Sequence, residues 1–313
     1  MITYDPASVP HPQLHGILLS GVAPRPIAFV ASRSANGDIN LAPFSFFNAF
    51  ASKPPVVAIG PAMSVRSGKV KDTWRNILET GECTISAVTY GMLHQMNIAA
   101  AEYPAGTDEF VKAGFTKVPA ETVNVPYVGE SPFAMECRFI QNIELFREEG
   151  GNGNIMLLRV HRIHVKESVL TDGKIDPRKM DLIARMGYHW YARVTPQVCF
   201  ELPQPGNRCG IGLDMLPEPI RQSPILTGND LGQLASVLEL PARDPSFREP
   251  RSNADSVEHE LIAGNPRGAL DAALRLGPSN QWTFHRIARA FLAVNDVFGA
   301  WQTLYLAHPE IAP

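Results

Sequence analysis

An apolar hairpin near the N-terminus constrains this chain more than any other feature. Residues 27–32 form a short apolar run just after a proline, and the dipeptide Asn36-Gly37 separates it from a second run, 38–42. A two-residue hairpin turn prefers Asn-Gly, because both central residues then take positive φ. We therefore expect two antiparallel strands, over 27–32 and 38–42, with the second ending at Pro43.

The segment 44–48 directly after this hairpin has an unusual composition. Its three phenylalanines are interleaved with the hydroxyl of Ser45 and followed by the carboxamide of Asn48. A flat heteroaromatic ring with polar edges requires such a mixture of apolar surface and hydrogen-bonding groups. A buried sheet corner in which the phenylalanines are only core residues explains the same letters. On these residues alone both interpretations stay open.

A second segment, 64–73, is basic and rich in hydroxyl groups, and a helix is predicted to follow it over 72–80. Asp72 or Thr73 is a suitable N-cap, and Gly81 stands where the helix should end. Unpaired N–H groups and the helix dipole both favour an anion at a helix N-terminus, so a phosphate site is predicted here. A basic loop that is merely solvated is the alternative.

Together the two segments resemble the flavin reductase-like, FMN-binding split-barrel family, which includes the flavoredoxins. Four motifs carry the resemblance in the family's order: Arg-Pro-Ile-Ala-Phe-Val from 25, Asn-Leu-Ala-Pro-Phe-Ser-Phe-Phe-Asn from 40, Pro-Pro-Val-Val from 54 and Lys-Asp-Thr-Trp-Arg-Asn-Ile from 71. The family implies a mainly β (α+β) fold, a Greek-key split β-barrel. It also implies a homodimer that binds FMN near the subunit interface.

The resemblance assigns cofactor-binding residues in both segments. The isoalloxazine and ribityl chain would lie along Ser45, Phe46, Phe47 and Asn48. The phosphate would be framed by Ser64, Arg66, Lys71, Asp72 and Thr73. Free-flavin reductases of this fold often carry Gly-Asp-His before the last barrel strand, whereas residues 150–154 here read Gly-Gly-Asn-Gly-Asn. NAD(P)H is therefore expected only as a possible co-substrate.

Aromatic residues close the matched region. Tyr188, His189, Trp190 and Tyr191 could stack on or near the flavin, but an aromatic cluster at a dimer contact would have the same composition. The ordinary pKa of histidine suits proton transfer, so His189 is the one candidate for a catalytic residue.

The chain is longer than most single domains, at 313 residues. We expect a barrel domain over 1–198 and a linker with a helical extension of unknown role over 199–313. The formal net charge of −3 argues against nucleic acid or an anionic membrane as the main partner. A homodimer, and a monooxygenase or redox protein as partner, are the interactions that the resemblance implies.

No signal peptide, membrane segment or metal site is predicted. The N-terminus lacks a basic start and an apolar run, so a cytoplasmic protein is expected. The four cysteines contain no Cys-x-x-Cys pair. His161 and His164, three residues apart on a predicted strand, would point to opposite faces.

Periodicity predicts the remaining elements. Strands are expected over 55–60, 83–88, 133–147 and 155–168, and helices over 90–101, 228–240, 256–263 and 267–276. Residues 203–224, dense in Pro and Gly, are expected to be a linker or an arm that wraps the barrel. One long final helix is predicted from the apolar stripe Ile287, Phe291, Val294, Phe298 and Trp301.

The residues and the resemblance together predict an FMN-binding oxidoreductase, most simply an NAD(P)H-dependent flavin reductase. A flavoredoxin-like electron carrier that holds FMN tightly is an alternative. A third is a non-catalytic FMN-binding protein whose helical tail docks a partner. In the first two cases the flavin carries the redox chemistry and the protein positions it.

Overall fold

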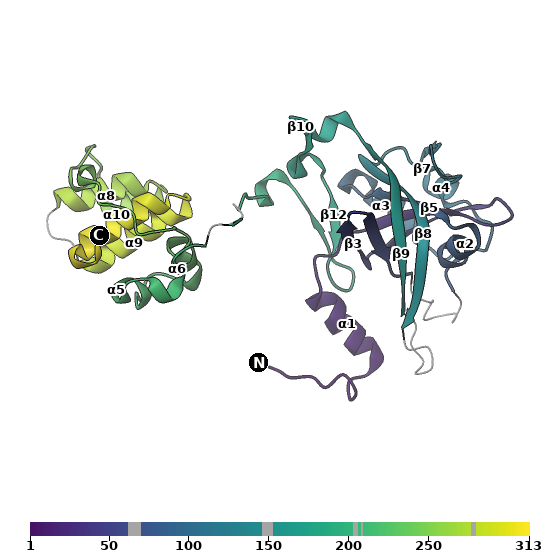
Figure 1. Ribbon diagram of the computed structural model, residues 1–313, viewed down its shortest axis with the longest axis horizontal. Coiled ribbons are helices and arrows are strands. Elements are labelled where there is room, and N and C mark those ends of the chain that lie inside the picture. The colour runs from purple at the N-terminus through teal and green to yellow at the C-terminus, as the bar shows by residue number, and fades with distance from the viewer. Residues whose placement is uncertain (62–69, 146–152, 203–205, 208, 277–279) are drawn as a thin grey trace. The chain divides into compact units, whose positions relative to one another are not determined.

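The computed structural model describes residues 1–61, 70–145, 153–202, 206–207, 209–276 and 280–313. They fall into two compact units, Met1–Glu201 and Leu202–Pro313. Figure 1 colours the first unit from purple to teal and the second from green to yellow. Each unit has an apolar core of its own and is described by itself.

The first unit is built on a seven-stranded antiparallel sheet with the order β2-β1-β5-β8-β9-β4-β3. Its strands are β1 (Ala28–Arg33), β2 (Ile39–Phe44), β3 (Phe47–Ser52), β4 (Pro55–Ile59), β5 (Glu82–Ala87), β8 (Phe133–Leu145) and β9 (Gly153–Val165). The predicted strands 55–60 and 83–88 correspond to β4 and β5. The predicted long hairpin corresponds to β8 and β9, which pair along their lengths.

The sheet curls so that one end of each edge strand meets at a corner. β2 and β3 are the edge strands, yet only Ser45 and Phe46 separate them in the chain. Three Cα–Cα steps span at most about 11 Å, so the ends of β2 and β3 must lie close together at this corner. The segment that the sequence singled out is therefore the point at which the sheet closes.

The predicted β1–β2 hairpin is confirmed, but its predicted two-residue turn is wrong. Arg33 pairs with Ile39, and the loop between them is closed by hydrogen bonds from Ser34 N to Asp38 O and from Gly37 N to Ser34 O, both 2.9 Å. Only Gly37 has positive φ (94°). The side chains of Ser34 and Asp38 also hydrogen-bond to each other (3.2 Å), which stabilises the longer loop.

Strand β1 is buried on both faces. Phe29 and Ala31 belong to one apolar cluster, whereas Ala28 and Val30 belong to another. The first cluster is completed by α3 (Leu93–Ala99) and α4 (Glu109–Ala113), and the second by α2 (Asp72–Thr80). This double burial explains why the run 27–32 is apolar at successive positions rather than at alternate ones.

Helix α2 has the predicted length, but its predicted N-cap is wrong. The N-cap is Lys71, and Asp72 is already helical. The carboxylate of Asp72 instead accepts from Arg75 Nη2 at 2.5 Å. Gly81 ends the helix with φ of 74°, as predicted.

The remaining elements of the first unit are short. The helical segment predicted over 90–101 is a 3₁₀ turn (Tyr90–Met92) followed by α3. An additional helix, α1, covers His11–Gly21. Small two-stranded sheets are formed by β6 (Lys117–Val118) with β7 (Tyr127–Val128), by β10 (Leu170–Thr171) with β11 (Lys174–Ile175), and by β12 (Ile183–Arg185) with β13 (Tyr191–Arg193).

A buried carboxylate ties a loop to the sheet. Glu136 on β8 accepts hydrogen bonds from the backbone N–H groups of Glu121 and Thr122, and lies 2.7 Å from His164 Nε2. Burial opposes ionisation of Glu136, but the hydrogen bonds from Glu121, Thr122 and His164 outweigh it and lower its pKa to about 2. Within the described residues no three metal-ligating side chains come together.

The second unit is helical, with α5 (Glu218–Arg221), α6 (Gly228–Leu234), α7 (Val257–Ile262), α8 (Pro266–Arg275), α9 (Gln281–Ala293) and α10 (Val297–Ala307). The prediction that 203–224 forms a linker or an arm around the barrel is wrong for its second half. Leu216 and Ile220 are buried in the core of the helical unit. None of the helices that the structure describes combines the length and apolarity of a membrane span.

The predicted final helix is wrong, because it is two helices. Asn295, at φ of 61°, ends α9, and the carboxylate of Asp296 caps α10 by accepting from Gly299 N at 2.7 Å. Val294 and Phe298 therefore leave the core and are about half exposed, at 52% and 46%. The pair Asn295-Asp296 ends one helix and caps the next, whereas the apolar stripe alone predicted that the helix continues.

The last four helices repeat one helical hairpin. Gly264 between α7 and α8 and Asn295 between α9 and α10 both have positive φ (68° and 61°). The next residue, Asn265 or Asp296, caps the following helix by accepting from the N–H three residues later, at 3.0 and 2.7 Å. Corresponding positions stand 31 residues apart. A spacing of this size is typical of stacked helical hairpins.

A pair of buried histidines lies in the core of the helical unit. His285 is fully buried, with Nδ1 2.7 Å from Ser223 Oγ and Nε2 2.9 Å from His308 Nε2. Burial, and then the neighbouring His308, lowers the pKa of His285 to about 4. In the unfolded chain the ring would titrate near its ordinary pKa of about 6.5. As pH falls, His285 therefore binds its proton in the unfolded chain before it does so in the folded chain, and the folded state loses stability.

We predict that the two units lose stability in different pH windows. The helical unit should weaken as pH falls from about 6.5 to about 4, because of His285. The barrel unit loses the contribution of Glu136 only between about 4.5 and 2. Hydrogen–deuterium exchange of the full chain, corrected for intrinsic rates, should show α9 and α10 losing protection before β8 and β9. Equal loss in both units down to pH about 4 would contradict this assignment.

Candidate functional site

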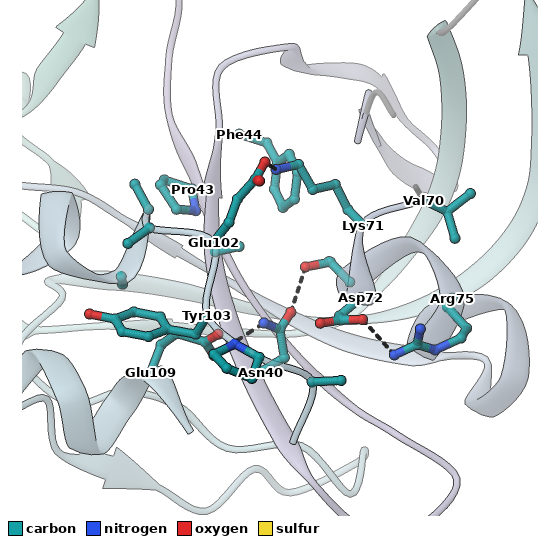
Figure 2. Close-up of a pocket in the computed structure, with 17 residues that line it drawn as sticks. Asn40, Pro43, Phe44, Val70, Lys71, Asp72, Arg75, Glu102, Tyr103 and Glu109 are labelled. Atoms are coloured by element: carbon teal, nitrogen blue, oxygen red, sulfur yellow. Dashed lines mark hydrogen bonds and ion pairs between the residues drawn. The ribbon is translucent and has the colours of Figure 1, made fainter. Parts of the chain in front are cut away.

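A cleft of about 820 Å³ lies beside the first turn of α2 (Figure 2). It is bounded by β2, by the start of α2 and by residues 99–105, which begin with the last residue of α3. We call it the main cleft. Its polar and charged lining residues are Asn40, Lys71, Asp72, Thr73, Arg75, Glu102, Tyr103 and Glu109.

The first turn of α2 presents hydrogen-bond donors to the main cleft. The first intrahelical bonds run from Trp74 N and Arg75 N to Lys71 O, at 3.0 and 3.2 Å. The N–H groups of Asp72 and Thr73 precede these bonds, and no described side chain caps the helix. These N–H groups, the helix dipole and the Lys71 ammonium together favour an anion.

An ion pair closes over this anion-binding end. Lys71 Nζ lies 3.1 Å from Glu102 Oε1, and both side chains are substantially exposed, at 36% and 50%. Figure 2 shows the two side chains reaching toward each other from α2 and from the segment after α3. Exposed pairs of this kind contribute less than about 1 kcal/mol. A phosphate could therefore replace the Glu102 carboxylate at Lys71 at little cost.

A buried polar network holds the floor of the main cleft. Glu109 Oε2 accepts from Leu41 N at 2.8 Å and from Asn40 Nδ2 at 3.1 Å. Asn40 Oδ1 in turn accepts from Thr73 Oγ1 at 2.7 Å. Burial raises the pKa of Glu109, while the hydrogen bonds from Leu41 and Asn40 act in the opposite direction. The network fixes β2 against α2 and α4.

A second, smaller cleft continues from the main cleft. Its volume is about 350 Å³, and it shares Pro43, Phe44 and Ala100 with the main cleft. We call it the side cleft. Its other lining residues are Ile27, Ser45, Met96, Asn97, Arg185, His189 and Tyr191.

The structure brings part of the predicted site together. Lys71, Asp72 and Thr73 line the main cleft, and Ser45 and His189 line the side cleft. Thr73 is almost completely buried, and its hydroxyl is already committed to Asn40. Lys71 is therefore the stronger of the two for binding an anion.

Other predicted residues lie outside the two clefts. Phe47 packs against the core beneath α2, whereas Phe46 and Asn48 are exposed at the corner and on β3. Tyr188 and Trp190 are also exposed, at 63% and 74%. Ser64 and Arg66 lie outside the described residues, as does most of the Gly-Gly-Asn-Gly-Asn stretch.

Sequence reasoning missed several residues of the clefts, among them Glu109 and Arg185. Glu109 lies in α4, in a region rich in turn residues, and has no motif spacing that points to a ligand. Arg185 lies on β12, which bridges to Arg25, and its one local signal is the Arg-Met-Gly sequence just before the aromatic residues 188–191.

The arrangement fits FMN. FMN is elongated, with a phosphate at one end of a ribityl chain and a planar ring system at the other. The main cleft offers N–H donors and Lys71 for the phosphate. Pro43 and Phe44 line both clefts and lead from the main cleft to the side cleft. The side cleft offers apolar surface, with Ser45 as a hydrogen-bonding group. A phosphate site beside an apolar ring site is the combination that FMN requires.

Residues 20–183 match the family model described as a flavin reductase like domain, which is just over half of the chain. The chain belongs to the flavin reductase-like family. This membership confirms the resemblance drawn from the four motifs. It supports a flavin-related oxidoreductase with the split-barrel fold and an additional helical unit at the C-terminus.

Individual proteins are similar to this chain in sequence or in structure. An uncharacterised protein of Deinococcus radiodurans is 35% identical over 191 residues, which cover 59% of this chain and 82% of that protein. The crystal structure of nitrilotriacetate monooxygenase component B from Bacillus cereus is 31% identical, with a TM-score of 0.61, covering 64% of this chain and 98% of that one. The 2-nitrobenzoate 2-nitroreductase NbaA of Pseudomonas fluorescens shares the fold, at 23% identity and a TM-score of 0.57 over 64% of this chain and 96% of its own.

We predict that Glu109→Ala destabilises the barrel unit by about 1–3 kcal/mol, because it leaves the buried N–H of Leu41 without an acceptor. Glu109→Gln keeps a carbonyl oxygen for that N–H and removes a buried charge, so it should stay within about 1 kcal/mol of the wild type. Urea unfolding followed by circular dichroism measures both. Equal destabilisation by the two variants would show that the charge, and not the acceptor, is required.

Proposed function

We propose that the chain is an FMN-dependent flavin reductase that takes its electrons from NAD(P)H. The observation that carries the proposal is the main cleft, in which the uncapped start of α2 and Lys71 make a phosphate site. Membership of the flavin reductase-like family supports a flavin at this place. A single phosphate site favours FMN over FAD.

When bound, FMN supplies the redox chemistry by accepting a hydride and passing electrons on. The chain's own residues hold and orient it. The N–H groups of Asp72 and Thr73, with Lys71, bind the phosphate. The ring system lies along Pro43 and Phe44, which line both clefts. Ser45, the next residue, supplies a hydroxyl, and His189 in the side cleft is placed to exchange a proton with a second substrate.

The reduced flavin would serve a partner protein or leave as free flavin. The similar Bacillus cereus protein is named as a monooxygenase component. We therefore propose a monooxygenase as the acceptor of electrons from this chain. No membrane or nucleic acid is required in this scheme.

We also propose that the barrel unit pairs with a second copy of the chain. Strand β3 is an edge strand, and five of its six residues are exposed. Phe46 and Phe50 present large apolar side chains there, 46% and 68% exposed. An exposed edge with aromatic groups is a surface that proteins normally cover.

A flavoredoxin-like electron carrier is the second candidate. The Gly-Asp-His sequence of many free-flavin reductases is absent from 150–154. A carrier would hold FMN through the same phosphate site but would receive electrons from a redox protein rather than from a nicotinamide. A non-catalytic FMN-binding protein would keep the site and lose turnover.

We predict that Lys71→Ala weakens FMN binding about 10- to 100-fold, because a charge-assisted contact to the phosphate is removed. Lys71→Ala with Thr73→Ala should weaken it only slightly further, since Thr73 already donates to Asn40. Flavin fluorescence titration measures the affinities. Riboflavin, which has no phosphate, should bind the wild type and the variants alike.

Lys174→Ala is the matched control, because Lys174 is an exposed lysine that lines neither cleft. Its FMN affinity should equal that of the wild type. If Lys71→Ala also binds FMN normally, the phosphate does not lie at α2.

Reduction by nicotinamide separates the candidate functions. We predict that the absorbance of bound flavin at about 450 nm decreases when NADH or NADPH is added under anaerobic conditions. Flavin that stays bound and oxidised with both nucleotides, but is reduced by dithionite, would favour the carrier. A wild-type protein that takes up no FMN would overturn all three flavin-based proposals.

A further inference from the structure

The side cleft has positive charge without a balancing carboxylate. Arg185 lines it, and no acidic residue is among its lining residues in the described part of the chain. This contrasts with the main cleft, where Lys71 and Arg75 each pair with a carboxylate. The excess of positive charge is therefore local to the side cleft.

A second, buried arginine adds to this charge. Arg25 is only 6% exposed, and its Nε lies 3.5 Å from Ser45 Oγ, a lining group of the side cleft. Its Nη1 donates to the backbone oxygens of Leu19 and Val22 at the end of α1, whereas Nη2 has no partner among the described residues. Burial, and then the charge of Arg185, lowers the pKa of Arg25.

The two arginines are held together by the backbone. Arg25 N donates to Arg185 O and Arg185 N donates to Arg25 O, both at 2.9 Å. Within the described residues, Arg25 donates only to neutral oxygens, and no carboxylate pairs with either guanidinium. Two neighbouring positive charges, one of them buried, are costly unless an anion compensates them. The arrangement thus calls for an anionic group in the side cleft.

The geometry of Arg185 favours a planar anion. Its guanidinium stacks over the ring of Tyr191, 4.6 Å from the ring centroid, and its Nη2 donates to Tyr188 O. A guanidinium fixed in this way presents a rigid, planar set of donors, which matches a carboxylate. The rest of the cleft is walled by Ile27, Phe44 and Met96. Its volume of about 350 Å³ is at the small end of ligand sites, so a single ring fits better than a nucleotide.

We propose that the side cleft binds a small aromatic carboxylate as a second ligand beside the flavin, with Arg185 as the group that binds the carboxylate. The proposal rests on the proposed function, because it places this ligand next to the ring of FMN. Phe44, Met96 and Tyr191 contact the aromatic ring, and Arg25 supports the charge from behind Ser45. The specificity of the enzyme then includes an anionic, ring-bearing substrate.

The test titrates the FMN-loaded full chain with benzoate and follows the flavin spectrum and the heat of binding. Benzoate should bind, and benzamide, its neutral analogue, should bind at least about 10-fold more weakly. Arg185→Gln should weaken benzoate at least about 10-fold and leave benzamide unchanged. Arg185→Lys keeps the charge but loses the planar donors, so its benzoate affinity should lie between those of the wild type and of Arg185→Gln.

Arg193→Gln is the matched control. Arg193 lies on the same small hairpin and stacks over Tyr90, 3.9 Å from the ring centroid, but lines neither cleft. Benzoate affinity of this variant should equal that of the wild type. Equal benzoate affinity in Arg185→Gln and wild type, equal binding of benzamide and benzoate, or no benzoate binding would overturn the proposal. If inorganic phosphate competes for the side cleft as strongly as benzoate does, the cleft binds anions in general and the aromatic-carboxylate proposal is wrong.

The same samples separate this inference from the proposed function. If the wild-type chain and all variants bind FMN but benzoate does not bind, the subsite is wrong and the FMN site stands. If the wild-type chain binds no FMN, the proposed function fails. Retained FMN binding in Arg185→Gln also shows that the variant is folded.

Discussion

The barrel unit depends on one strand that is buried on both of its faces. Successive residues of β1 enter two different apolar cores, one capped by α3 and α4 and the other by α2. Because both faces need cover, the helices must lie on opposite sides of the same strand. All three helices also contact β2, the neighbour of β1 in the sheet. The main cleft forms beside β2, next to the start of α2 and to residues 99–105.

The closing corner and the clefts share the same short segment. Pro43 and Phe44 end β2 and line both clefts, and Ser45 and Phe46 turn the chain from one sheet edge to the other. A ligand placed along Pro43 and Phe44 would therefore contact the point where the sheet closes. Binding and closure should stabilise each other, since a ligand that binds only the folded state stabilises it.

The two clefts differ in how their charges are balanced. In the main cleft, carboxylates pair with Lys71 and Arg75, so an incoming phosphate exchanges one anion for another. In the side cleft, the described residues offer no such carboxylate, and the positive charges of Arg25 and Arg185 remain. An anion that displaces a carboxylate suits the main cleft, whereas an anion that adds the missing negative charge suits the side cleft.

The sequence by itself determined the local elements and the family: the β1–β2 hairpin, the extent of α2 with its terminal Gly81, and the long β8–β9 hairpin follow from periodicity and turn residues. It also placed Lys71 and Thr73 at a helix start. Only the tertiary structure decided which of these residues share a cleft. Glu109 and Arg185 are distant in sequence from β2. Glu109 reaches β2 through helix packing, and Arg185 reaches the side cleft through a strand bridge to Arg25. The break at Asn295 shows the same limit, since a helical stripe reports which residues can face a core and not where capping groups end the helix.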